Sequence, residues 1–176
     1  MSLLVTKSGV CDTLQDEGRF GYQHLGVNPN GVMDVSASTI ANALVGNHQH
    51  SAVLEMSFPA ASLLFKSGAL IAISGADFTP ILNGNKIPLN TPIRVAPDSE
   101  LKFLKVVRGR FCYLAVLGGF SVHAVLGSTS TNLAAGFGGF NGRRLKKGDE
   151  LRLNVCLREE TKIFSWRANT NLFGHG

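Results

Sequence analysis

Residues 52–117 decide the fold, and they read AVLEMSFPAASLLFKSGALIAISGADFTPILNGNKIPLNTPIRVAPDSELKFLKVVRGRFCYLAVL. Short apolar runs alternate here with glycine, proline, asparagine and charged residues, which is the pattern of successive β-strands. The runs are residues 52–58, 60–66, 69–74, 78–82, 87–89, 93–96, 101–107 and 111–117, with further strands predicted at 3–9 and 151–155. Their spacing predicts an all-β sandwich or barrel, and of these two we expect a closed barrel with few helices.

Turn-forming residues separate the runs. Asn83 and Gly84 form a pair suited to a tight hairpin, and the Arg-Gly-Arg sequence at 108–110 predicts another reversal. In the run that precedes this reversal, the alternation predicts that Leu101, Phe103 and Val107 face inward. The chain is therefore expected to reverse direction every few residues.

One short helix is predicted before these strands. Asp34 can cap its start, and the apolar stripe that follows ends at Gly46. The predicted polar face carries Ser36, Ser38 and Asn42. For Asn42 we weigh a hydrogen bond to a neighbouring loop, which we favour, against contact with a substrate. With this helix the chain is all-β in class, β-rich with one or two short helices.

Two long segments follow the period of neither a strand nor a helix. Residues 15–31 are predicted to form one shaped loop, and ordered loops of this length are uncommon and often functional. Residues 118–142 form a second, glycine-rich region. Because this region contains no phosphate-binding glycine motif between a strand and a helix, a nucleotide cradle is not predicted.

Composition narrows the class of protein and of partner. The chain has 176 residues, 44% hydrophobic and 16% charged, so we expect a globular protein with one main domain. The formal net charge is +5. The densest basic group lies within residues 143–147 and lacks an accompanying aromatic stacking pattern, so it is interpreted as a solvated turn. Nucleic acid is not an expected partner, whereas small anionic molecules are.

The termini and the cysteines predict location and redox state. Residues 1–7 lack the basic and apolar regions of a signal peptide, and no stretch reaches about 18 consecutive apolar residues, so neither secretion nor a membrane span is expected. A cytoplasmic location follows as the expectation. Cys11, Cys112 and Cys156 are widely spaced, without a nearby histidine at zinc-ligand spacing, and are interpreted as reduced structural thiols. No metal site is predicted.

Nine short motifs occur in a fixed order along the chain. They are QDEGRFG at 15–21, GVMD at 31–34, ANALVGN at 41–47, LE at 54–55, YLAV at 113–116, GGF at 118–120, LGSTST at 126–131, GGFNGR at 138–143 and KGD at 147–149. In this order they resemble the N-terminal half of the allophanate hydrolase subunit 2 family. That family includes the C subunit of 5-oxoprolinase and KipA-like proteins and is a biotin-dependent carboxyltransferase family.

The resemblance implies a fold and a setting. It implies a cyclophilin-like β-barrel over residues 1–156, an unassigned tail at 157–176, and a missing second β domain. It also implies a component of an ATP-dependent 5-oxoprolinase or a related amidohydrolase or carboxyltransferase, inactive alone. The implied partners are an allophanate hydrolase subunit 1 or KipI-like protein and a LamB/YcsF-like hydrolase subunit. The alternative is a non-catalytic module that antagonises a KipI-like inhibitor of a histidine kinase.

The resemblance also has implications for cofactors, and this chain differs from the family in two respects. No cofactor is expected on this chain, and ATP or carboxybiotin is expected at the level of the complex. Relatives commonly carry arginine where this chain has Thr129, so an anion contact made by that side chain would be missing. Relatives also run to about twice the length of this domain-sized chain.

The loop at 15–31 carries the catalytic candidates. Opening a cyclic amide or transferring a carboxyl group builds negative charge on oxygen, which hydrogen-bond donors must stabilise. Arg19 can bind a carboxylate through two hydrogen bonds, while Asp16 and Gln15 can orient its guanidinium or take part in proton transfer. Asp34 is a second carboxylate candidate. In the alternative, Asp16 and Arg19 pair with each other to hold the loop, and Asp34 only caps the helix.

The remaining candidates are predicted to bind substrate. They are Gln15, Asn42, Glu55, Ser128, Ser130 and Thr131. Glu55 interrupts an apolar strand, so it faces solvent or is paired internally, and an inward position would shift its pKa. The hydroxyl groups can donate hydrogen bonds to a small acid or amide, although a purely turn-forming role is favoured for the serines.

Overall fold

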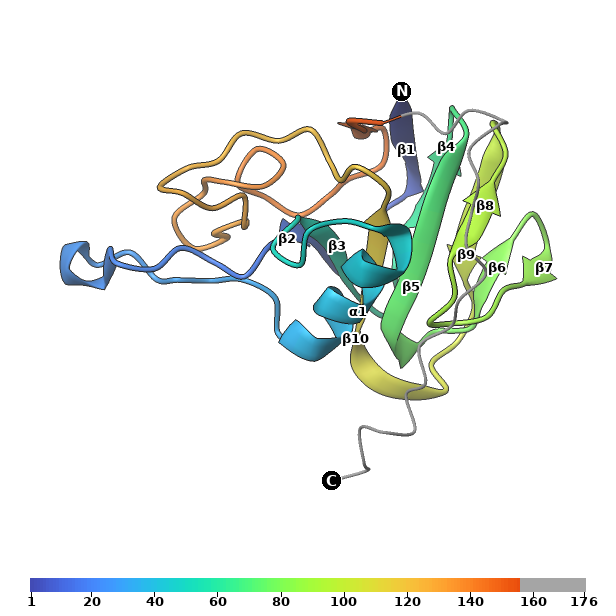
Figure 1. The fold of residues 1–176 in the computed structure, drawn as a ribbon, viewed down its shortest axis with the longest axis horizontal. Helices are drawn as coiled ribbons and strands as arrows, with labels where there is room; N and C mark the ends of the chain where they lie inside the picture. The colour runs from blue at the N-terminus through green and yellow to red at the C-terminus, as the bar shows by residue number, and fades with distance from the viewer. Residues whose placement is uncertain (156–176) are drawn as a thin grey trace.

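A computed structural model describes residues 1–155, which form two antiparallel sheets, one α-helix and a projecting arm (Figure 1). The first sheet has the order β11 (Glu150–Arg152), β1 (Ser2–Lys7), β4 (Ser62–Phe65), β9 (Ser99–Phe103), β6 (Pro80–Leu82) and β7 (Asn85–Lys86). The second has the order β2 (Cys11–Gln15), β3 (Val53–Ser57), β10 (Arg108–Val116), β5 (Ala69–Asp77) and β8 (Ile93–Val95). The β-rich class is confirmed. Within residues 1–155 both strand orders are open, so the closed barrel is not confirmed.

Two expectations fall partly beyond this range. The predicted tail at 157–176 and Cys156 lie outside the described residues. A single domain with bounds 1–156 therefore stays a prediction. No helix within residues 1–155 has both the length and the apolar character that crossing a membrane requires.

The second sheet is buried on both faces. Along β10, Cys112 and Leu114 belong to the large core that the two sheets share, whereas Tyr113 and Ala115 belong to a smaller core that contains helix residues. Successive side chains of a strand point to opposite faces, so the strand needs an apolar partner on each side. This requirement explains the nearly continuous apolar sequence from residue 111 to 117.

Helix α1 (Val35–Val45) covers the outer face of the second sheet. As predicted, the Asp34 carboxylate caps it by accepting a 2.9 Å hydrogen bond from the Ala37 N–H, and Gly46 ends it with a φ of 77°. Ser38 and Asn42, two residues of the predicted polar face, are buried. Asn42 donates to the carbonyls of residues 49 and 51, so the favoured loop interpretation is confirmed.

Three local predictions near the strands are wrong. Strand β2 is not among the predicted strands, and the structure places a two-residue strand at 85–86 instead of the one predicted at 87–89. Val107 does not face inward as predicted, because it lies beyond the end of β9 and is exposed. The predicted reversal at 108–110 is instead the irregular start of β10, because a left-handed Gly109 brings its backbone against Ala76 and shifts the strand register.

The predicted loop at 15–31 is an ordered arm that projects from the sheets. We define the arm as residues 16–33. Its two limbs are joined by a hydrogen bond from the Val32 N–H to the Asp16 carbonyl and another from the Arg19 N–H to the Pro29 carbonyl, both 2.8 Å. A 3-10 turn, η1 (Gln23–Leu25), forms the tip. Figure 1 shows the arm in blue at the left, with the loops of residues 120–145, in orange, beside its base.

Candidate functional site

The Asp16 carboxylate organises the base of the arm. Its Oδ1 accepts hydrogen bonds from the Gly18 N–H at 2.8 Å and from the hydroxyls of Ser128 and Ser130 at 2.6 and 2.5 Å. Its Oδ2 accepts from the N–H and the hydroxyl of Thr129 at 2.6 and 2.9 Å. Burial acts to raise the pKa of Asp16, but these hydrogen bonds outweigh burial and hold the pKa below its ordinary value. Asp16 is therefore ionised and fully engaged.

Arg19 lies directly behind the same loops. Its side chain is only 1% exposed, and its guanidinium lies 4.8 Å from the centre of the Phe137 ring. Nε donates to the Val125 carbonyl at 3.4 Å and Nη2 donates to the Ser130 carbonyl, but Nη1 has no hydrogen-bond partner within residues 1–155. Burial lowers the pKa of Arg19, and the Asp16 charge opposes that effect. The arm therefore brings one unused, buried donor into the loop region.

A cavity of about 560 Å³ opens among the loops near the base of the arm, and Arg19 is not among the described residues that line it. It lies between residues 121–125 and residues 136–142. Arg19 contacts this wall at Val125 and Phe137, and also at Gly138, where an added Cβ would lie 2.8 Å from Nη2. Gly138 is thus required for the close approach of the guanidinium to the glycine-rich segment.

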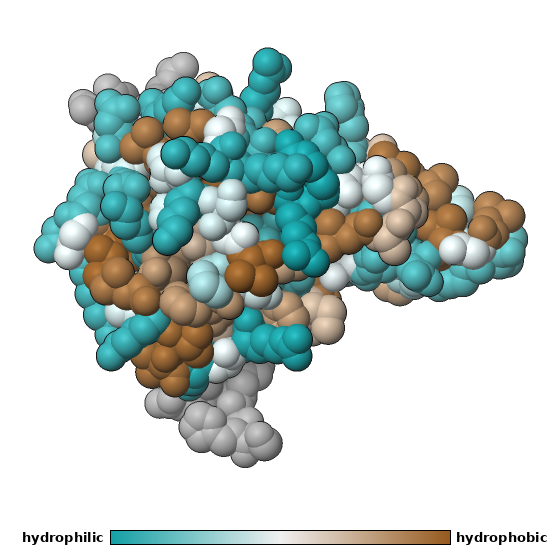
Figure 2. Space-filling view, turned by 180° about the vertical axis from the view of Figure 1, so that it is seen from behind, coloured by the Kyte–Doolittle hydropathy of each residue, from teal (hydrophilic) through white to brown (hydrophobic). Residues whose placement is uncertain are grey.

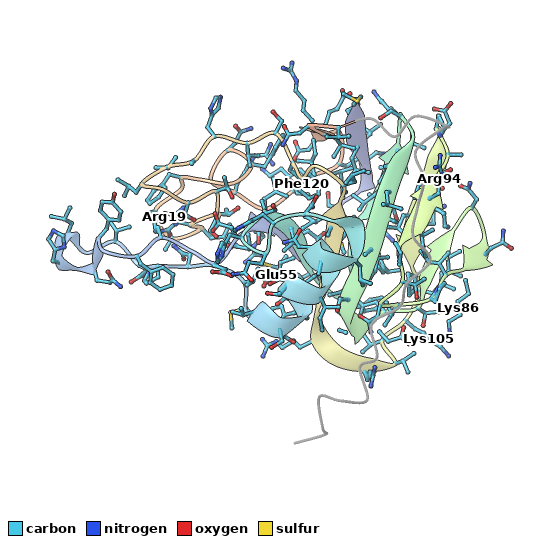
Figure 3. All side chains as sticks on the ribbon, viewed as in Figure 1. Arg19, Glu55, Lys86, Arg94, Lys105 and Phe120 are labelled. Carbon is cyan, nitrogen blue, oxygen red and sulfur yellow. The ribbon has the colours of Figure 1, made fainter. Side chains whose placement is uncertain are left out.

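A smaller cavity of about 150 Å³ adjoins the larger one. The two share Ser121, Val122 and Phe140 in their walls. The smaller cavity is lined further by Leu14, Phe120, Glu150, Leu151 and Arg152. Figure 3 shows Arg19 within the loops at the base of the arm and Phe120 nearer the sheets.

Gln15 and Thr131 join β2 to the loops. The Gln15 Nε2 donates to the Thr13 hydroxyl at 2.9 Å and to the Thr131 carbonyl at 3.3 Å, and the Thr131 hydroxyl donates to the Leu14 carbonyl at 2.9 Å. In the part of the chain that the structure describes, the buried Gln15 Oε1 has no hydrogen-bond partner. The structure thus brings together six of the predicted site residues, which are Gln15, Asp16, Arg19, Ser128, Ser130 and Thr131.

Asp34 and Glu55 lie apart from that group, at the end of the arm that enters helix α1. The Glu55 Oε2 accepts hydrogen bonds from the Met33 N–H at 2.7 Å and from the Tyr113 hydroxyl at 2.9 Å. The Tyr113 oxygen in turn accepts from the Asp34 N–H at 2.8 Å. Burial raises the pKa of Glu55 more than these two hydrogen bonds lower it. A catalytic role for Asp34 and a substrate contact for Glu55 stay predictions.

Two of the alternatives weighed from the sequence are answered. Within residues 1–155 no ion pair joins Asp16 to Arg19, because each side chain binds the segment at 125–130 instead. The face of Glu55, which the sequence left open, is the face that α1 covers.

Sequence reasoning missed three kinds of residue. The aromatic residues Phe120, Phe137 and Phe140 line the cavities, and Tyr113 supports Glu55. The glycine-phenylalanine repeats around the first three were a usable signal, as was the position of Tyr113 in a strand. Asp12 was also missed, and nothing in its sequence context marks it as buried.

The sequence and fold have clear relatives. Residues 25–172 match the family model "Carboxyltransferase domain, subdomain A and B". The chain is 42% identical over 151 residues to a urea amidolyase of Lachancea kluyveri, covering 85% of this chain and 8% of that protein. It is 34% identical over 157 residues to the 5-oxoprolinase C subunit of Escherichia coli, covering 89% of this chain and 51% of that protein. The chain therefore spans about half the length of the E. coli protein and a small part of the amidolyase.

Solved structures agree with the sequence matches. The K. lactis urea amidolyase aligns with a TM-score of 0.84 at 41% identity, covering 88% of this chain and 9% of that one. TTHA0988 aligns with a TM-score of 0.85 at 31% identity, covering 96% of this chain and 62% of that one. With a family model matched over most of its length, this chain belongs to the family of the carboxyltransferase domain, subdomain A and B.

Proposed function

We propose that this chain is the substrate-handling component of a 5-oxoprolinase-like or urea amidolyase-like system, and that the larger cavity binds a small acid or amide. Arg19 carries this proposal, because its guanidinium packs behind the wall of that cavity at Val125, Phe137 and Gly138, and within residues 1–155 its Nη1 has no hydrogen-bond partner. A buried donor without an acceptor is costly, so a ligand oxygen that accepts its hydrogen bond gains more there than at the surface. The relatives named as a 5-oxoprolinase component and as urea amidolyase supply the substrate class.

In this proposal the chain binds the substrate, and groups of the partner proteins carry out the reaction. Arg19 stays protonated, so it stabilises a carboxylate or a developing oxyanion rather than transferring a proton. Asp16 holds the loop of residues 128–130 in place through its hydrogen bonds.

The cofactors belong to the complex in this proposal. Among residues 1–155 no lysine or arginine lines the larger cavity, so this part of its wall does not suit the several charges of ATP. Carboxybiotin, when a partner presents it, would supply the carboxyl group for transfer. The proposed partners are an allophanate hydrolase subunit 1 or KipI-like protein and a LamB/YcsF-like hydrolase subunit.

Reconstitution with these partners tests the proposal. Turnover of 5-oxoproline with ATP, and of urea with carboxybiotin, is measured for the unchanged chain and for Arg19→Ala. We expect Arg19→Ala to lower turnover by about a hundredfold, the effect of removing one oxyanion donor. Arg110→Ala is the matched control, because Arg110 is exposed and its guanidinium lies 5.5 Å from the centre of the Phe111 ring, whereas Arg19 is buried against the wall of the larger cavity. Unchanged turnover in a folded Arg19→Ala chain removes Arg19 from the site.

A regulatory binding module is the second candidate function, and the arm favours it. Phe20, Leu25 and Met33 are each 67% exposed. Figure 2 shows hydrophobic side chains on this projecting part of the molecule. Exposed apolar side chains of this size mark contact with another protein. Copurification with a KipI-like protein that is lost in Leu25→Ser, together with no turnover in the complete mixture, supports this candidate over the first.

A further inference from the structure

We infer that one end of the first sheet is a docking surface for a protein segment that carries both carboxylates and aliphatic side chains. The surface consists of Lys86, Lys102 and residues 104–108, which we call the basic ridge. None of these described residues lines either cavity or belongs to the arm, so the inference goes beyond the proposed function and does not depend on it. Figure 3 shows Lys86 and Lys105 on the side of the molecule away from the arm.

Three aliphatic side chains of the basic ridge are exposed. Leu104, Val106 and Val107 are 58%, 46% and 57% exposed, and all three fall within residues 104–107. Single exposed apolar side chains are ordinary on protein surfaces, but several together mark a contact with another molecule. A partner that covers these side chains removes their apolar surface from water, which favours association.

Backbone hydrogen bonds hold these residues against the turn that joins β5 to β6. The Leu104 N–H donates to the Phe78 carbonyl at 3.1 Å, and the Val107 N–H donates to the Asp77 carbonyl at 2.8 Å. The aliphatic side chains are therefore held outward by a fixed backbone. Little entropy is lost in ordering this backbone when a partner covers it.

Cations surround the aliphatic side chains. Lys105 and Arg108 lie on either side of the two valines in the sequence, and the strand pairing places Lys86 and Lys102 opposite the same residue of β6. All four cationic side chains are exposed. Of the four, Lys102 alone forms an ion pair within residues 1–155, with Glu100 at 2.7 Å. The basic ridge therefore offers cations that are free to pair with carboxylates of a partner.

The basic ridge ends at Arg108. Asp77 lies opposite Arg108 in the second sheet, but its carboxylate already accepts a backbone hydrogen bond at 2.7 Å. Gly109 then turns the chain with a φ of 80°, and the guanidinium of Arg110 lies 5.5 Å from the centre of the Phe111 ring. Arg110 therefore has an aromatic contact of its own and is not part of the basic ridge.

These properties select one class of partner. Carboxylates of a protein segment can pair with the free cations while its aliphatic side chains cover residues 104–107. A second copy of the basic ridge would bring cations against cations, which opposes a symmetric contact. A nucleic acid binds through phosphates and stacked bases and would leave the aliphatic side chains uncovered. The basic ridge also lacks the tryptophan and tyrosine side chains that typically anchor a protein at a membrane surface.

Three capped synthetic peptides test the inference on the full chain. One alternates glutamate with valine, the second alternates glutamine with valine, and the third alternates glutamate with serine. Each is titrated while the backbone amide shifts of residues 104–108 are followed by NMR. We expect the glutamate-valine peptide to bind about tenfold more tightly than either of the others, since it alone supplies both carboxylates and aliphatic side chains.

Reversal of one charge tests the cations. Lys105→Glu should weaken binding of the glutamate-valine peptide about fivefold, because a carboxylate then opposes the carboxylates of the peptide. Lys66→Glu is the matched control, because it changes the net charge equally at the other end of the sheet. Lys66 follows Phe65, which lies opposite Ser99 at the start of β9, whereas residues 104–108 follow the end of β9. The control should weaken binding by less than about twofold.

Removal of one aliphatic side chain tests the apolar contact. Val107→Ser should weaken binding of the glutamate-valine peptide about fivefold, because less apolar surface is then covered. Leu133→Ser is the matched control and should leave binding unchanged. Leu133 is 41% exposed but lies in the loops of residues 120–145, beside the base of the arm (Figure 1). Amide spectra of each variant outside the substituted segment check that it is folded.

Each outcome bears on the inference. Equal binding of the three peptides, or equal losses in Lys105→Glu and Lys66→Glu, overturns it. Absence of amide shifts in residues 104–108 with every peptide also overturns it. Cosedimentation with phosphatidylserine vesicles that is lost in Lys105→Glu, in a chain that does not bind the glutamate-valine peptide, assigns the basic ridge to a lipid surface instead. The turnover test of Arg19→Ala is independent of these results, so the proposed function stands or fails separately.

Discussion

Asp16 and Arg19 are three residues apart and hold the same segment, residues 125–130, without pairing with each other. The carboxylate accepts from the hydroxyl and amide groups of that segment, and the guanidinium donates to its carbonyls. Asp16 therefore satisfies hydrogen-bond donors of this loop, and Arg19 satisfies hydrogen-bond acceptors of the same loop. An ion pair between the two would have left those groups without partners.

Replacing the carboxylate should release this loop. Asp16→Ala leaves several donors without an acceptor, so we expect the free energy of unfolding to fall by roughly 2–4 kcal/mol, measured by urea denaturation. Glu17→Ala is the matched control, because Glu17 forms only a partly exposed pair with His50 and should change stability by less than about 1 kcal/mol. Equal losses in both variants would contradict the role given to Asp16.

The glycine-rich segment offers a matched pair of substitutions. Gly136 and Gly138 have φ values of 70° and 74°, so alanine is strained to the same degree at both. An added Cβ meets nothing within 4 Å at Gly136 but lies 2.2 Å from the Ser130 carbonyl oxygen at Gly138. We expect Gly136→Ala to cost about 1 kcal/mol and Gly138→Ala at least about 2 kcal/mol more. Similar melting temperatures for the two variants would contradict the packing around Arg19.

The two tyrosines of the chain form another matched pair. Tyr113→Phe leaves the Asp34 N–H without an acceptor and removes a donor from Glu55, so it should destabilise the protein by about 1–3 kcal/mol. The hydroxyl of Tyr22, at the arm tip, has no hydrogen bond among the described contacts, and Tyr22→Phe should change stability by less than about 0.5 kcal/mol. Chemical denaturation of both variants measures the difference, and a smaller effect at Tyr113 would refute the buried contact.

Asp12 should make stability depend on pH. Its side chain is 1% exposed, its Oδ1 has no hydrogen-bond partner among residues 1–155, and burial raises its pKa to about 7 despite hydrogen bonds from the backbone. Because the folded pKa lies above the ordinary 3.8, the stabilising effect of protonated Asp12 is complete below about pH 4 and is lost as pH rises to about 7. The loss is about 1.4 kcal/mol per pH unit within that window.

Asp12→Asn isolates this contribution. The variant keeps an acceptor for the Ala61 N–H but does not titrate. Its unfolding free energy, measured at intervals from pH 4 to pH 8, should decline less steeply than that of the unchanged chain. Glu55 also has a raised pKa and remains in both proteins, so a shallower slope rather than a flat one is expected. Parallel slopes would show that Asp12 titrates normally.

Sequence patterns predicted the parts of the fold that depend on local periodicity and capping. The apolar run at residues 53–57 and the Asp34 cap are examples, since both depend on neighbours in the chain. The cap was correct, but the burial of Ser38 and Asn42 was not predicted, because it depends on the sheet that α1 covers. The closed barrel also failed to appear, since sheet closure depends on pairing between distant strands.

The candidate site, too, was predicted only where it depends on residues that are close in the sequence. Arg19 and Asp16 were recognisable by their chemistry within one loop, but their partners lie more than a hundred residues away. Which oxygen each donor would reach could not be read from residues 15–31 alone. Asp12 was missed because its burial comes from the meeting of two sheets, whereas its own sequence neighbours are polar or small.

The arm leaves the body of the protein and returns to it at one place, because Asp16 is bonded to Val32 and Arg19 to Pro29. Residues 20–28 lie beyond these two hydrogen bonds. They can be exchanged for another peptide without moving the two attachment points. The loop-closure entropy changes by only about 0.6 kcal/mol for each doubling of length. The tip is therefore a natural position for grafting a recognition sequence or a reporter onto this protein.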